Sequence, residues 1–578
     1  MLTEKPPLLN AAVCALNSQY IHSSLAPWYL AAAAKAYCQY PVHVDVLEYT
    51  VNQPDDVICD GVAASPATVI GFSCYIWNVA VIRRLLPLLA ARRPDVTWIL
   101  GGPEASFHAD ELLHDLPMVS FILAGEGERP FSLLLDTLSI GVPDQALADI
   151  PGLCYRIDGE VIEKPPFYTD EEPPSPYIDA YFDSLKGRIA YLETSRGCPF
   201  SCAFCLSGRE NQVRFFSLER AKADVLRLAN AGCQTVKLVD RTFNCHKQRC
   251  YELLSFIVEQ AGTGIPPGVC FHVEVAADLF DERTLRLLGR APAGLIQMEV
   301  GLQSFLPETL QAVSRRTNLD RICEVVRRLL EPQNIHVHID LIAGLPYEGW
   351  EEFADSFDRA FALRPHMLQL GFLKLLYGSR LRRDAEEYGY VYSADPPYEL
   401  ASSRWMPAEA MARLHDTEDA LERLYNSGRF RGTIDYLLGA TGQRPFNLFT
   451  QFGGYAAAAG ETQGLPLDTY TQRVWDYFSI QPGVDARRLR DVMACDCLGS
   501  QRGGLLPPCL RRPDPRISRI KRTLAAASGR ADGVKRGVAI LYSAGERVAV
   551  AEYREGARHP VTGLYPLTYY DNIRELIQ

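Results

Sequence analysis

Three closely spaced cysteines have the clearest capacity for chemistry in this chain. Cys198, Cys202 and Cys205 form a C-x3-C-x2-C pattern that begins in a Gly-Cys-Pro turn. Three thiolates on one loop can bind three irons of a cubane iron–sulfur cluster, which leaves the fourth iron without a protein ligand. An open coordination position is what lets a metal site take up a substrate.

Two other interpretations of the triplet remain open. A zinc ion would require a fourth Cys or His nearby, and the next candidates, Cys233 and His246, lie well downstream. The three residues can also be structural thiols that bind nothing. Because the triplet is dense and follows a Gly-Cys-Pro turn, the sequence favours the iron–sulfur cluster.

At these residues the chain resembles the radical S-adenosylmethionine (SAM) superfamily, whose signature is C-x3-C-x-aromatic-C. Phe204 fills the aromatic position. The resemblance implies that Cys198, Cys202 and Cys205 bind a 4Fe-4S cluster whose open iron chelates SAM. It also implies that electron transfer splits SAM into methionine and a 5′-deoxyadenosyl radical, and that the backbone around Phe204 lies against the adenine.

Composition indicates a folded protein of several domains. The chain has 578 residues, of which 47% are hydrophobic and 22% are charged, and this suggests about three domains. A net charge of −11 argues against a protein that coats nucleic acid. The sixteen cysteines are dispersed, many in apolar runs, which is typical of the reducing cytoplasm. Met1–Asn10 predicts no signal peptide, and no apolar run approaches the roughly 20 residues of a membrane span.

Residues 1–140 predict a Rossmann-like domain, because short apolar strands alternate with helices from residue 9 in the order β-α-β-β-α-β-α-β-α. The predicted strands are Leu9–Leu16, Val42–Tyr49, Val69–Tyr75, Thr97–Gly101 and Val119–Ala124, and the predicted helices are Ser23–Cys38, Asn78–Ala91 and Ala105–His114. Such a pattern gives a parallel sheet covered on both faces, with ligands beyond the carboxyl ends of its strands.

The runs at those strand ends resemble the cobalamin-binding domain that precedes the barrel in one branch of the radical SAM superfamily. The run Gly101–Ser106 reads GGPExS, and Gly125–Glu128 reads GEGE. The chain lacks the D-x-H-x-x-G run whose His ligates cobalt in other cobalamin domains, and His22, His108 and His114 lie in other contexts. The resemblance therefore implies base-off cobalamin without a His ligand. An inert α/β scaffold is the alternative.

The predicted cobalamin contacts follow from this resemblance, and we expect Tyr75 or Trp77 to shield one face of the corrin. The full set is Ser18, Ser73, Cys74, Tyr75, Gly101, Gly102, Pro103, Glu104, Gly125 and Glu126.

A proline-rich and acidic stretch, residues 141–187, predicts a surface linker. Residues 188–375 then predict a partial (β/α)6 TIM-type barrel. Its predicted strands are Ile189–Thr194, Thr235–Val239, Cys270–Val275, Leu295–Val300, Val337–Ile342 and Met367–Leu373, and its helices include Leu218–Asn230, Lys247–Ala261, Arg283–Arg290, Leu319–Leu330 and Trp350–Leu363.

Residues after the barrel strands match the places where the superfamily binds SAM. The predicted contacts, besides Phe204, are Asp240, Arg241, Glu299, Gln303, Ser304 and Ile342. Asp240 and Glu299 have an alternative role as cap or salt-bridge residues. Arg241 can equally pair with Asp240 or Glu274. Glu274 and His272 share one side of their strand, facing substrate or packing as a polar pair.

Residues 376–578 predict a mixed α+β accessory region that covers the substrate. Met411–Tyr425 is an amphipathic helix, and Gly537–Ser543 and Arg547–Glu552 alternate like paired strands. Cys495, Cys497 and Cys509 can hold a second metal site or be plain thiols. Arg511–Arg536 carries nine Lys or Arg against two Asp, a run that binds phosphates such as those of RNA or forms a solvated face.

The resemblance implies a cobalamin-dependent radical SAM enzyme that methylates an unactivated carbon of an unknown small molecule or peptide. It implies a 4Fe-4S cluster, SAM and cobalamin as cofactors, and a flavodoxin- or ferredoxin-type electron donor. Three alternatives remain: radical rearrangement without methyl transfer, tRNA modification, and a non-catalytic cobalamin sensor. We expect a cytoplasmic protein without a membrane partner, and nucleic acid is a less favoured partner.

Overall fold

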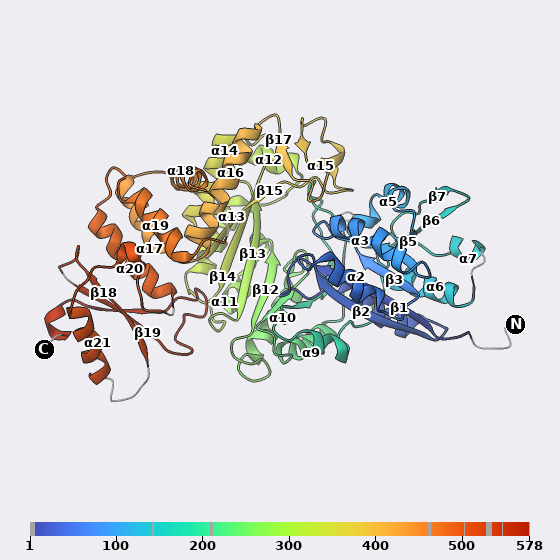
Figure 1. The fold of residues 1–578 in the computed structure, drawn as a ribbon, viewed down its shortest axis with the longest axis horizontal. Coiled ribbons are helices and arrows are strands. Elements are labelled where there is room, and N and C mark those ends of the chain that lie inside the picture. Colours follow the sequence, from blue (N-terminus) through green and yellow to red (C-terminus); the bar gives the residue numbers. More distant parts are fainter. Residues whose placement is uncertain are drawn as a thin grey trace. The chain divides into compact units, whose positions relative to one another are not determined.

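The computed structural model describes residues 6–141, 144–208, 212–460, 464–501, 503–527, 534–545 and 547–576. The chain forms two compact units, which are described one at a time. The first contains Met1–Glu274 and Lys374–Leu400, and the second contains Val275–Leu373 and Ala401–Gln578. Figure 1 labels their elements.

The first unit begins with a seven-stranded sheet of order β2-β1-β3-β4-β5-β6-β7. Its strands are β1 (Leu9–Asn17), β2 (Val42–Thr50), β3 (Val69–Ser73), β4 (Thr97–Gly101), β5 (Val119–Leu123), β6 (Leu153–Ile157) and β7 (Glu160–Ile162). The helices between them are α1 (Ala26–Tyr37), α2 (Asp55–Ala63), α3 (Val79–Arg92), α4 (Pro103–Ser106), α5 (Ala109–Asp115), α6 (Glu128–Ser139) and α7 (Asp144–Ala148).

Alternation along β1 builds a core on each face of this sheet. Cys14 and Leu16 belong to the cluster that contains Leu86 of α3, whereas Ala11 and Val13 belong to the cluster that contains Phe131 of α6. Successive side chains of a strand point to opposite faces, so a strand buried on both sides reads as one continuous apolar run. The predicted Rossmann-like parallel sheet is therefore confirmed for β1 to β5.

Three predictions for this region were wrong. Helix α2 separates β2 from β3, where we predicted two consecutive strands; it begins with two aspartates and buries Ile58, Cys59 and Val62. The single helix predicted for Ala105–His114 is two short helices, α4 and α5. The predicted linker contains β6 and β7, which extend the sheet in antiparallel fashion. The longest described stretch of the predicted linker with neither helix nor extended strand is 163–178.

The first unit also contains three parallel strands of the predicted barrel, β8 (Ala190–Leu192), β11 (Thr235–Leu238) and β12 (Cys270–Val275). Helices α9 (Leu218–Ala229) and α10 (Lys247–Gln260) follow β8 and β11 in the chain. A two-stranded antiparallel ribbon that we did not predict, β9 (Ser195–Gly197) with β10 (Val213–Phe215), brackets the cysteine triplet. The remaining elements are α8 (Asp179–Ser184), α15 (Arg380–Arg383), β16 (Val391–Tyr392) and β17 (Leu400–Ser402) at the unit boundary.

The second unit contributes the other three predicted barrel strands, β13 (Ile296–Gln303), β14 (His336–Ala343) and β15 (Met367–Phe372), which are parallel. Helices α11 (Glu282–Leu288), α12 (Pro307–Ala312), α13 (Leu319–Leu330) and α14 (Trp350–Ala362) alternate with these strands. All six predicted strands and five predicted helices of residues 188–375 are therefore present, within a few residues of their predicted bounds.

The last part of the second unit is helical and ends in a small sheet. The helices are α16 (Ala408–Leu421) with the π-helical segment Glu422–Asn426, α17 (Arg431–Thr441), α18 (Pro445–Ala458), α19 (Leu467–Phe478), α20 (Ala486–Ser500) and α21 (Arg516–Ala527). The predicted pair of final strands is confirmed as β18 (Lys535–Leu541) and β19 (Arg547–Tyr553), and β20 (Leu567–Tyr570) adds a third strand.

Two features of this region look structural. Cys495 and Cys497 lie two residues apart on α20 and so point in different directions, and Cys497 is buried. In the basic run, α21 packs Ile520 and Leu524 against the small sheet. Arg516 pairs with Asp514 at 2.7 Å and Arg536 pairs with Glu552 at 2.7 Å. Arg530 and Asp532 of that run lie outside the described residues.

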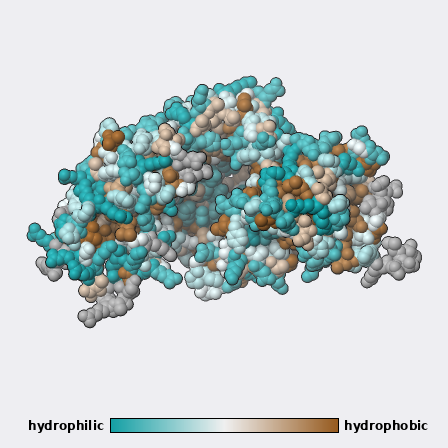
Figure 2. All heavy atoms as spheres, viewed as in Figure 1, coloured by the Kyte–Doolittle hydropathy of each residue, from teal (hydrophilic) through white to brown (hydrophobic). Residues whose placement is uncertain are grey.

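Figure 2 shows hydrophilic residues over most of the face in view, with hydrophobic residues in small groups. Within the part of the chain that the structure describes, no helix is both long and apolar enough to cross a membrane.

Gly125→Ala should lower the urea midpoint of unfolding more than Gly159→Ala. Gly125 has φ +90°, and an added Cβ would lie 2.2 Å from the Phe167 carbonyl oxygen. Gly159 has φ +87° but nothing within 4 Å. Both variants carry the backbone strain, about 1–3 kcal/mol, so their difference isolates the clash. Equal midpoints would show that the Phe167 contact imposes no constraint.

Candidate functional site

A cavity of about 1130 Å³ lies in the first unit, at the carboxyl ends of its parallel strands. It exceeds the roughly 300–1,000 Å³ of ordinary small-molecule pockets, so it suits an unusually large ligand or several ligands. Its lining includes Ser18, Ser73, Tyr75, Gly101, Gly102, Pro103, Glu104, Gly125, Glu126, Phe204, Cys205 and Arg241. Residues predicted to bind cobalamin and residues predicted to bind SAM therefore line the same cavity.

The glycine-rich turns at one side of the cavity are held by close backbone contacts. At Gly102, with φ +97°, an added Cβ would lie 2.6 Å from the Cys74 carbonyl oxygen. The Ser106 hydroxyl donates to the Gly102 carbonyl oxygen at 2.8 Å and accepts from the Gly125 N–H at 3.0 Å. The serine of the GGPExS run thus ties that run to the GEGE run.

Two of the predicted cobalamin contacts on this side, Cys74 and Glu104, are engaged in hydrogen bonds within the protein. The Cys74 thiol is fully buried outside the lining, where it donates to the Phe72 carbonyl oxygen at 3.7 Å, and burial raises its pKa to about 12. Glu104 lines the cavity, but its carboxylate accepts a 2.8 Å hydrogen bond from the Tyr398 hydroxyl. A cradling role for the Cys74 thiol does not fit this placement.

Tyr75 and Trp77 both line the cavity and stack on each other, with ring centroids 4.4 Å apart and planes within 6°, so the pair has a flat outer ring face. Asn78 positions this turn: its side-chain amide donates to the Leu16 and Ser73 carbonyl oxygens and accepts from the Tyr75 N–H. A flat ring pair of this kind can cover one face of a planar macrocycle.

His22 lies at the cavity, whereas His108 and His114 are not among its lining residues. His22 Nδ1 is 2.8 Å from the Tyr191 hydroxyl oxygen. Burial lowers the pKa of His22, and the charges of Lys237 and Arg188 act in the same direction. The ring is therefore neutral near pH 7, and among the described residues His22 is the histidine that lines the cavity.

The cysteine loop is closed by its flanking ribbon. Cys198 and Cys202 are buried, and Cys205 is half-buried at the cavity. Cys198 Sγ lies 3.3 Å from Thr242 Oγ1, and the Ser207 N–H donates to Cys205 Sγ at 3.4 Å. Within the described ranges no three His, Cys, Asp or Glu side chains converge on a single metal ion. A cubane iron–sulfur cluster does not require the thiolates to converge on a single ion, because each thiolate binds its own iron.

Arg196, two residues before the first cysteine, is the hub of a buried ion-pair network. Its guanidinium contacts Glu128 at 2.6 Å, Glu193 at 3.0 Å and Glu126 at 3.2 Å. Arg214, its ribbon partner, also contacts Glu126 at 2.9 Å. Burial alone would lower the pKa of Arg196, but the carboxylates outweigh it and raise the pKa well above its usual range.

The network gives both glutamates of the GEGE run a structural role. The pKa of Glu128 falls because Arg196 overcomes the effect of burial, whereas burial leaves the pKa of Glu126 raised despite its two arginine partners. Sequence analysis named Glu126 as a cobalamin contact and overlooked Glu128, Arg196 and Arg214. The available signal was an arginine two residues before the first cysteine and two glutamates in the Gly-rich run that follows β5.

Asp240 and Arg241, adjacent in sequence, have different positions. Asp240 is buried and accepts hydrogen bonds from the Thr194 N–H at 2.9 Å, the Thr194 hydroxyl at 2.7 Å and the Ser195 hydroxyl. Burial raises the pKa of Asp240 to about 6. These bonds favour the structural alternative for Asp240. Arg241 lines the cavity, and its charge lowers the pKa of Tyr75 against the larger opposing effect of burial.

The structure pairs Glu274 with a residue other than Arg241. Glu274 lies 3.7 Å from Lys237 of the neighbouring strand. His272 is buried on the same strand.

The remaining predicted SAM contacts lie in the second unit. Glu299 pairs in register with His338, two residues before the Gly301–Asp340 pair, so Glu299 and Ile342 share one face of the β13–β14 pair. Gln303 ends β13 at a bulge with φ +75°, an uncommon conformation for a non-glycine residue. Ser304 is fully buried and donates to Glu348 at 2.6 Å, so its hydroxyl serves the fold.

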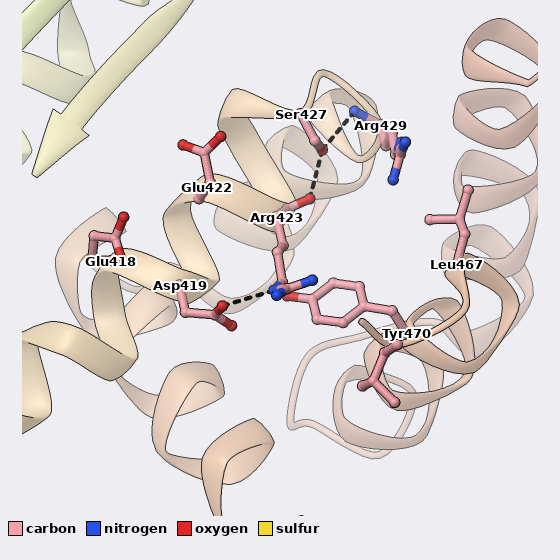
Figure 3. Close-up of a pocket in the computed structure, with 9 residues that line it drawn as sticks. Glu418, Asp419, Glu422, Arg423, Ser427, Arg429, Leu467 and Tyr470 are labelled. Atoms are coloured by element: carbon pink, nitrogen blue, oxygen red, sulfur yellow. Dashed lines mark hydrogen bonds and ion pairs between the residues drawn. The ribbon is translucent and has the colours of Figure 1, made fainter. Parts of the chain in front are cut away.

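A second cavity, of about 470 Å³, lies among α16, the segment Glu422–Asn426 and α19. Figure 3 shows Asp419 and Arg423, four residues apart on one helical stretch, paired at 2.8 Å with the Tyr470 ring beside them. Glu422 accepts from the Asn426 amide at 2.9 Å. Asp419 and Arg423 are thus ion-paired, and Glu422 is hydrogen-bonded to a neutral amide.

Three family models match the chain. The B12 binding domain matches residues 12–135, the radical SAM superfamily matches residues 192–360, and a protein of unknown function (DUF4080) matches residues 386–534.

Curated relatives and solved structures also match this chain. The cobalamin-dependent radical SAM methyltransferase TokK of Streptomyces tokunonensis is 27% identical over 322 residues, 52% of this chain and 46% of TokK. The anaerobic magnesium-protoporphyrin IX monomethyl ester cyclase of Rubrivivax gelatinosus is 24% identical over 351 residues, 56% of this chain and 59% of the cyclase. The chain thus spans about half the length of these relatives.

Among solved structures, the cobalamin-dependent S-adenosylmethionine radical enzyme OxsB, with aqua-cobalamin and S-adenosylmethionine bound, matches with a TM-score of 0.58. The two chains are 15% identical, and the match covers 85% of this chain and 78% of OxsB. This likeness concerns the fold.

Arg196→Met should destabilise the protein far more than Arg129→Met. The first variant leaves three buried carboxylates without their shared cation, a loss of about 3–5 kcal/mol. Arg129 pairs with Glu171 at 2.9 Å, with side chains 45% and 60% exposed, so its removal should cost at most about 1 kcal/mol. Thermal unfolding followed by circular dichroism measures both. Equal shifts in the unfolding midpoint would show that the network contributes no more than a surface pair.

Proposed function

This chain carries a B12-binding domain followed by a radical SAM domain and is homologous to cobalamin-dependent radical SAM methyltransferases, and we propose on that basis that it is such an enzyme. It uses a 4Fe-4S cluster, SAM and cobalamin to methylate an unactivated carbon of a substrate that the sequence does not identify. A flavodoxin- or ferredoxin-type protein supplies the electron.

One observation carries the proposal. The strand ends of the first sheet and the cysteine loop line the same cavity, so a large ligand on the sheet would lie beside a ligand on the cysteine loop. Methyl transfer requires this adjacency, because the methyl carrier and the hydrogen-abstracting group must act on one carbon. An inert scaffold or a cobalamin sensor would not need it.

The residues at the cavity suit the three cofactors. Cys198, Cys202 and Cys205 offer three soft sulfur ligands on one loop. On the sheet side, Gly101, Gly102 and Gly125 leave space for close approach to the backbone, and Tyr75 with Trp77 offers a flat surface. His22 lines the cavity and uses Nδ1 in its contact with the Tyr191 hydroxyl. The absence of a D-x-H-x-x-G run is what supports cobalamin bound without a histidine on cobalt.

For SAM, we assign Phe204 to the adenine side and Arg241 to the carboxylate, which a guanidinium binds well as a bidentate fork. Glu299, Gln303 and Ile342 remain candidates from the second unit, with Glu299 suited to a ribose hydroxyl pair. When bound, the cluster supplies an electron for SAM cleavage and cobalamin supplies a methyl carrier. The chain's own residues bind, orient and exclude water.

A second candidate is radical chemistry without methyl transfer. The observation that favours it is that one relative of similar coverage is a cyclase rather than a methyltransferase.

Anaerobically isolated protein should contain about four irons per chain, and the Cys198/Cys202/Cys205→Ala variant should contain almost none. The matched control is Cys495/Cys497/Cys509→Ala, which should retain its iron because α20 points its two cysteines apart. Iron analysis with Mössbauer spectroscopy measures both. Iron lost from the control and kept by the first variant would move the cluster to the C-terminal region.

With reductant and SAM, the protein should release 5′-deoxyadenosine, and it should also release S-adenosylhomocysteine when cobalamin is bound. The first product reports reductive cleavage of SAM and the second reports loss of its methyl group. Liquid chromatography with mass spectrometry measures their ratio. Deoxyadenosine alone from the cobalamin-loaded protein would favour the second candidate. If the protein released neither product, both candidate functions would be contradicted.

A further inference from the structure

The segment Lys374–Leu400, here called the strap, belongs to the first unit although it follows the barrel strands in sequence. Its two ends meet, because Lys374 and Glu399 form an antiparallel bridge and the Leu375 N–H donates to the Tyr398 carbonyl oxygen at 2.9 Å. A loop with joined ends behaves as one compact piece. The strap can therefore transmit a constraint from one of its contacts to another.

Arg382 is the centre of the strap. Its guanidinium carbon lies 3.6 Å from the Tyr377 ring centroid, 4.9 Å from that of Tyr398 and 5.3 Å from that of Tyr392. It also donates to the Leu375 carbonyl oxygen at 2.6 Å. A planar cation stacked among aromatic rings stiffens the loop through cation–π attraction and packing.

One side of the strap contacts the turn after β4, which lines the cavity. The Tyr398 hydroxyl donates to the buried Glu104 carboxylate at 2.8 Å, directly after Gly101–Pro103. Tyr377 stacks on the His108 ring at 3.8 Å. Burial raises the pKa of Glu104, and the Tyr398 hydrogen bond acts against that rise.

Tyr398 holds a backbone conformation that bulky residues rarely adopt, with φ +57°. Such a conformation costs free energy and persists where surrounding contacts impose it. The contacts at Tyr398 include the backbone hydrogen bonds with Leu375 and Asp395 and the hydroxyl bond to Glu104.

The other side of the strap is hydrogen-bonded to the cysteine loop. The Leu381 N–H donates at 3.0 Å to the carbonyl oxygen of Ala203, which lies between Cys202 and Cys205, and Leu381 is fully buried. Leu376 of the strap lines the cavity itself. The same short segment therefore holds both the Gly101–Glu104 turn and the cysteine loop.

We infer that the strap couples the cobalamin site to the cluster site, with Tyr398 as the positioning residue on the cobalamin side. This inference rests on the proposed function. It makes cobalamin affinity depend on cluster loading: an ordered cysteine loop holds the strap in place, and the strap holds the turn that cradles cobalamin. Removal of the Tyr398 hydroxyl breaks that link and leaves Glu104, which lines the cavity, without this donor.

The test is equilibrium dialysis of hydroxocobalamin against the full chain, with the cluster present and with iron removed by chelation. Wild-type protein should bind hydroxocobalamin several-fold more tightly with the cluster than without it. Tyr398→Phe should weaken binding by about 5- to 100-fold, the effect of leaving one buried charged acceptor unpaired. It should also bind equally with and without the cluster.

Tyr392→Phe is the matched control, because it removes the same hydroxyl from another tyrosine of the strap. Of the contacts described above, the Tyr392 ring makes only the one with Arg382. It should retain wild-type affinity and wild-type cluster dependence. Iron content and circular dichroism check that each variant is folded. Tyr398→Phe protein with unchanged affinity and unchanged cluster dependence would overturn the inference.

A double variant guards against an indirect effect of misfolding. If Tyr398 acts through Glu104, the loss of affinity in Glu104→Gln/Tyr398→Phe falls short of the two single losses combined. Fully additive losses would overturn the inference. Wild-type protein that binds no cobalamin in either state would instead contradict the proposed function, and this inference with it.

Discussion

The buried Arg196 guanidinium is the interaction on which the site depends. Removing a cation and three carboxylates from water costs several kcal/mol for each ion, and only close pairing offsets that cost. The pairing has a geometric consequence, because two of the carboxylates follow β5 of the first sheet and the third follows β8, while Arg196 belongs to the ribbon beside the cysteines. The sheet end and the cysteine loop must therefore meet in one arrangement.

Charged residues around the cavity mostly position other residues. Asp240 holds the Thr194–Ser195 turn, Glu126 and Glu128 hold the arginines, and Glu104 is held by Tyr398. A carboxylate buried at a strand end must be hydrogen-bonded or paired. The groups left to face ligands are then the small, aromatic and sulfur-bearing ones, together with Arg241. This division suits cofactors that supply the reactive groups themselves.

Long periodic elements were predicted well and short ones poorly. The barrel strands and helices such as α13 carry strong apolar periodicity, and that pattern reports burial directly. Helix α2, strands β6 and β7, and the β9–β10 ribbon were missed because each is short and is stabilised by contacts with distant residues. The two ribbon strands, for example, have three residues each and depend on pairing across the cysteine loop.

The sequence by itself determined the ligand chemistry: the cysteine spacing and the glycine-rich runs are local patterns, and local patterns dictate which groups one loop can present. Tertiary structure decided which candidates face the cavity. It turned the Cys74 thiol into the core, engaged Asp240 and Ser304 in hydrogen bonds, and brought Tyr398 to Glu104 across 294 positions of sequence. The physical reason is that a polar side chain goes to the partner that compensates its burial, and that partner is chosen by the fold rather than by its neighbours in the chain.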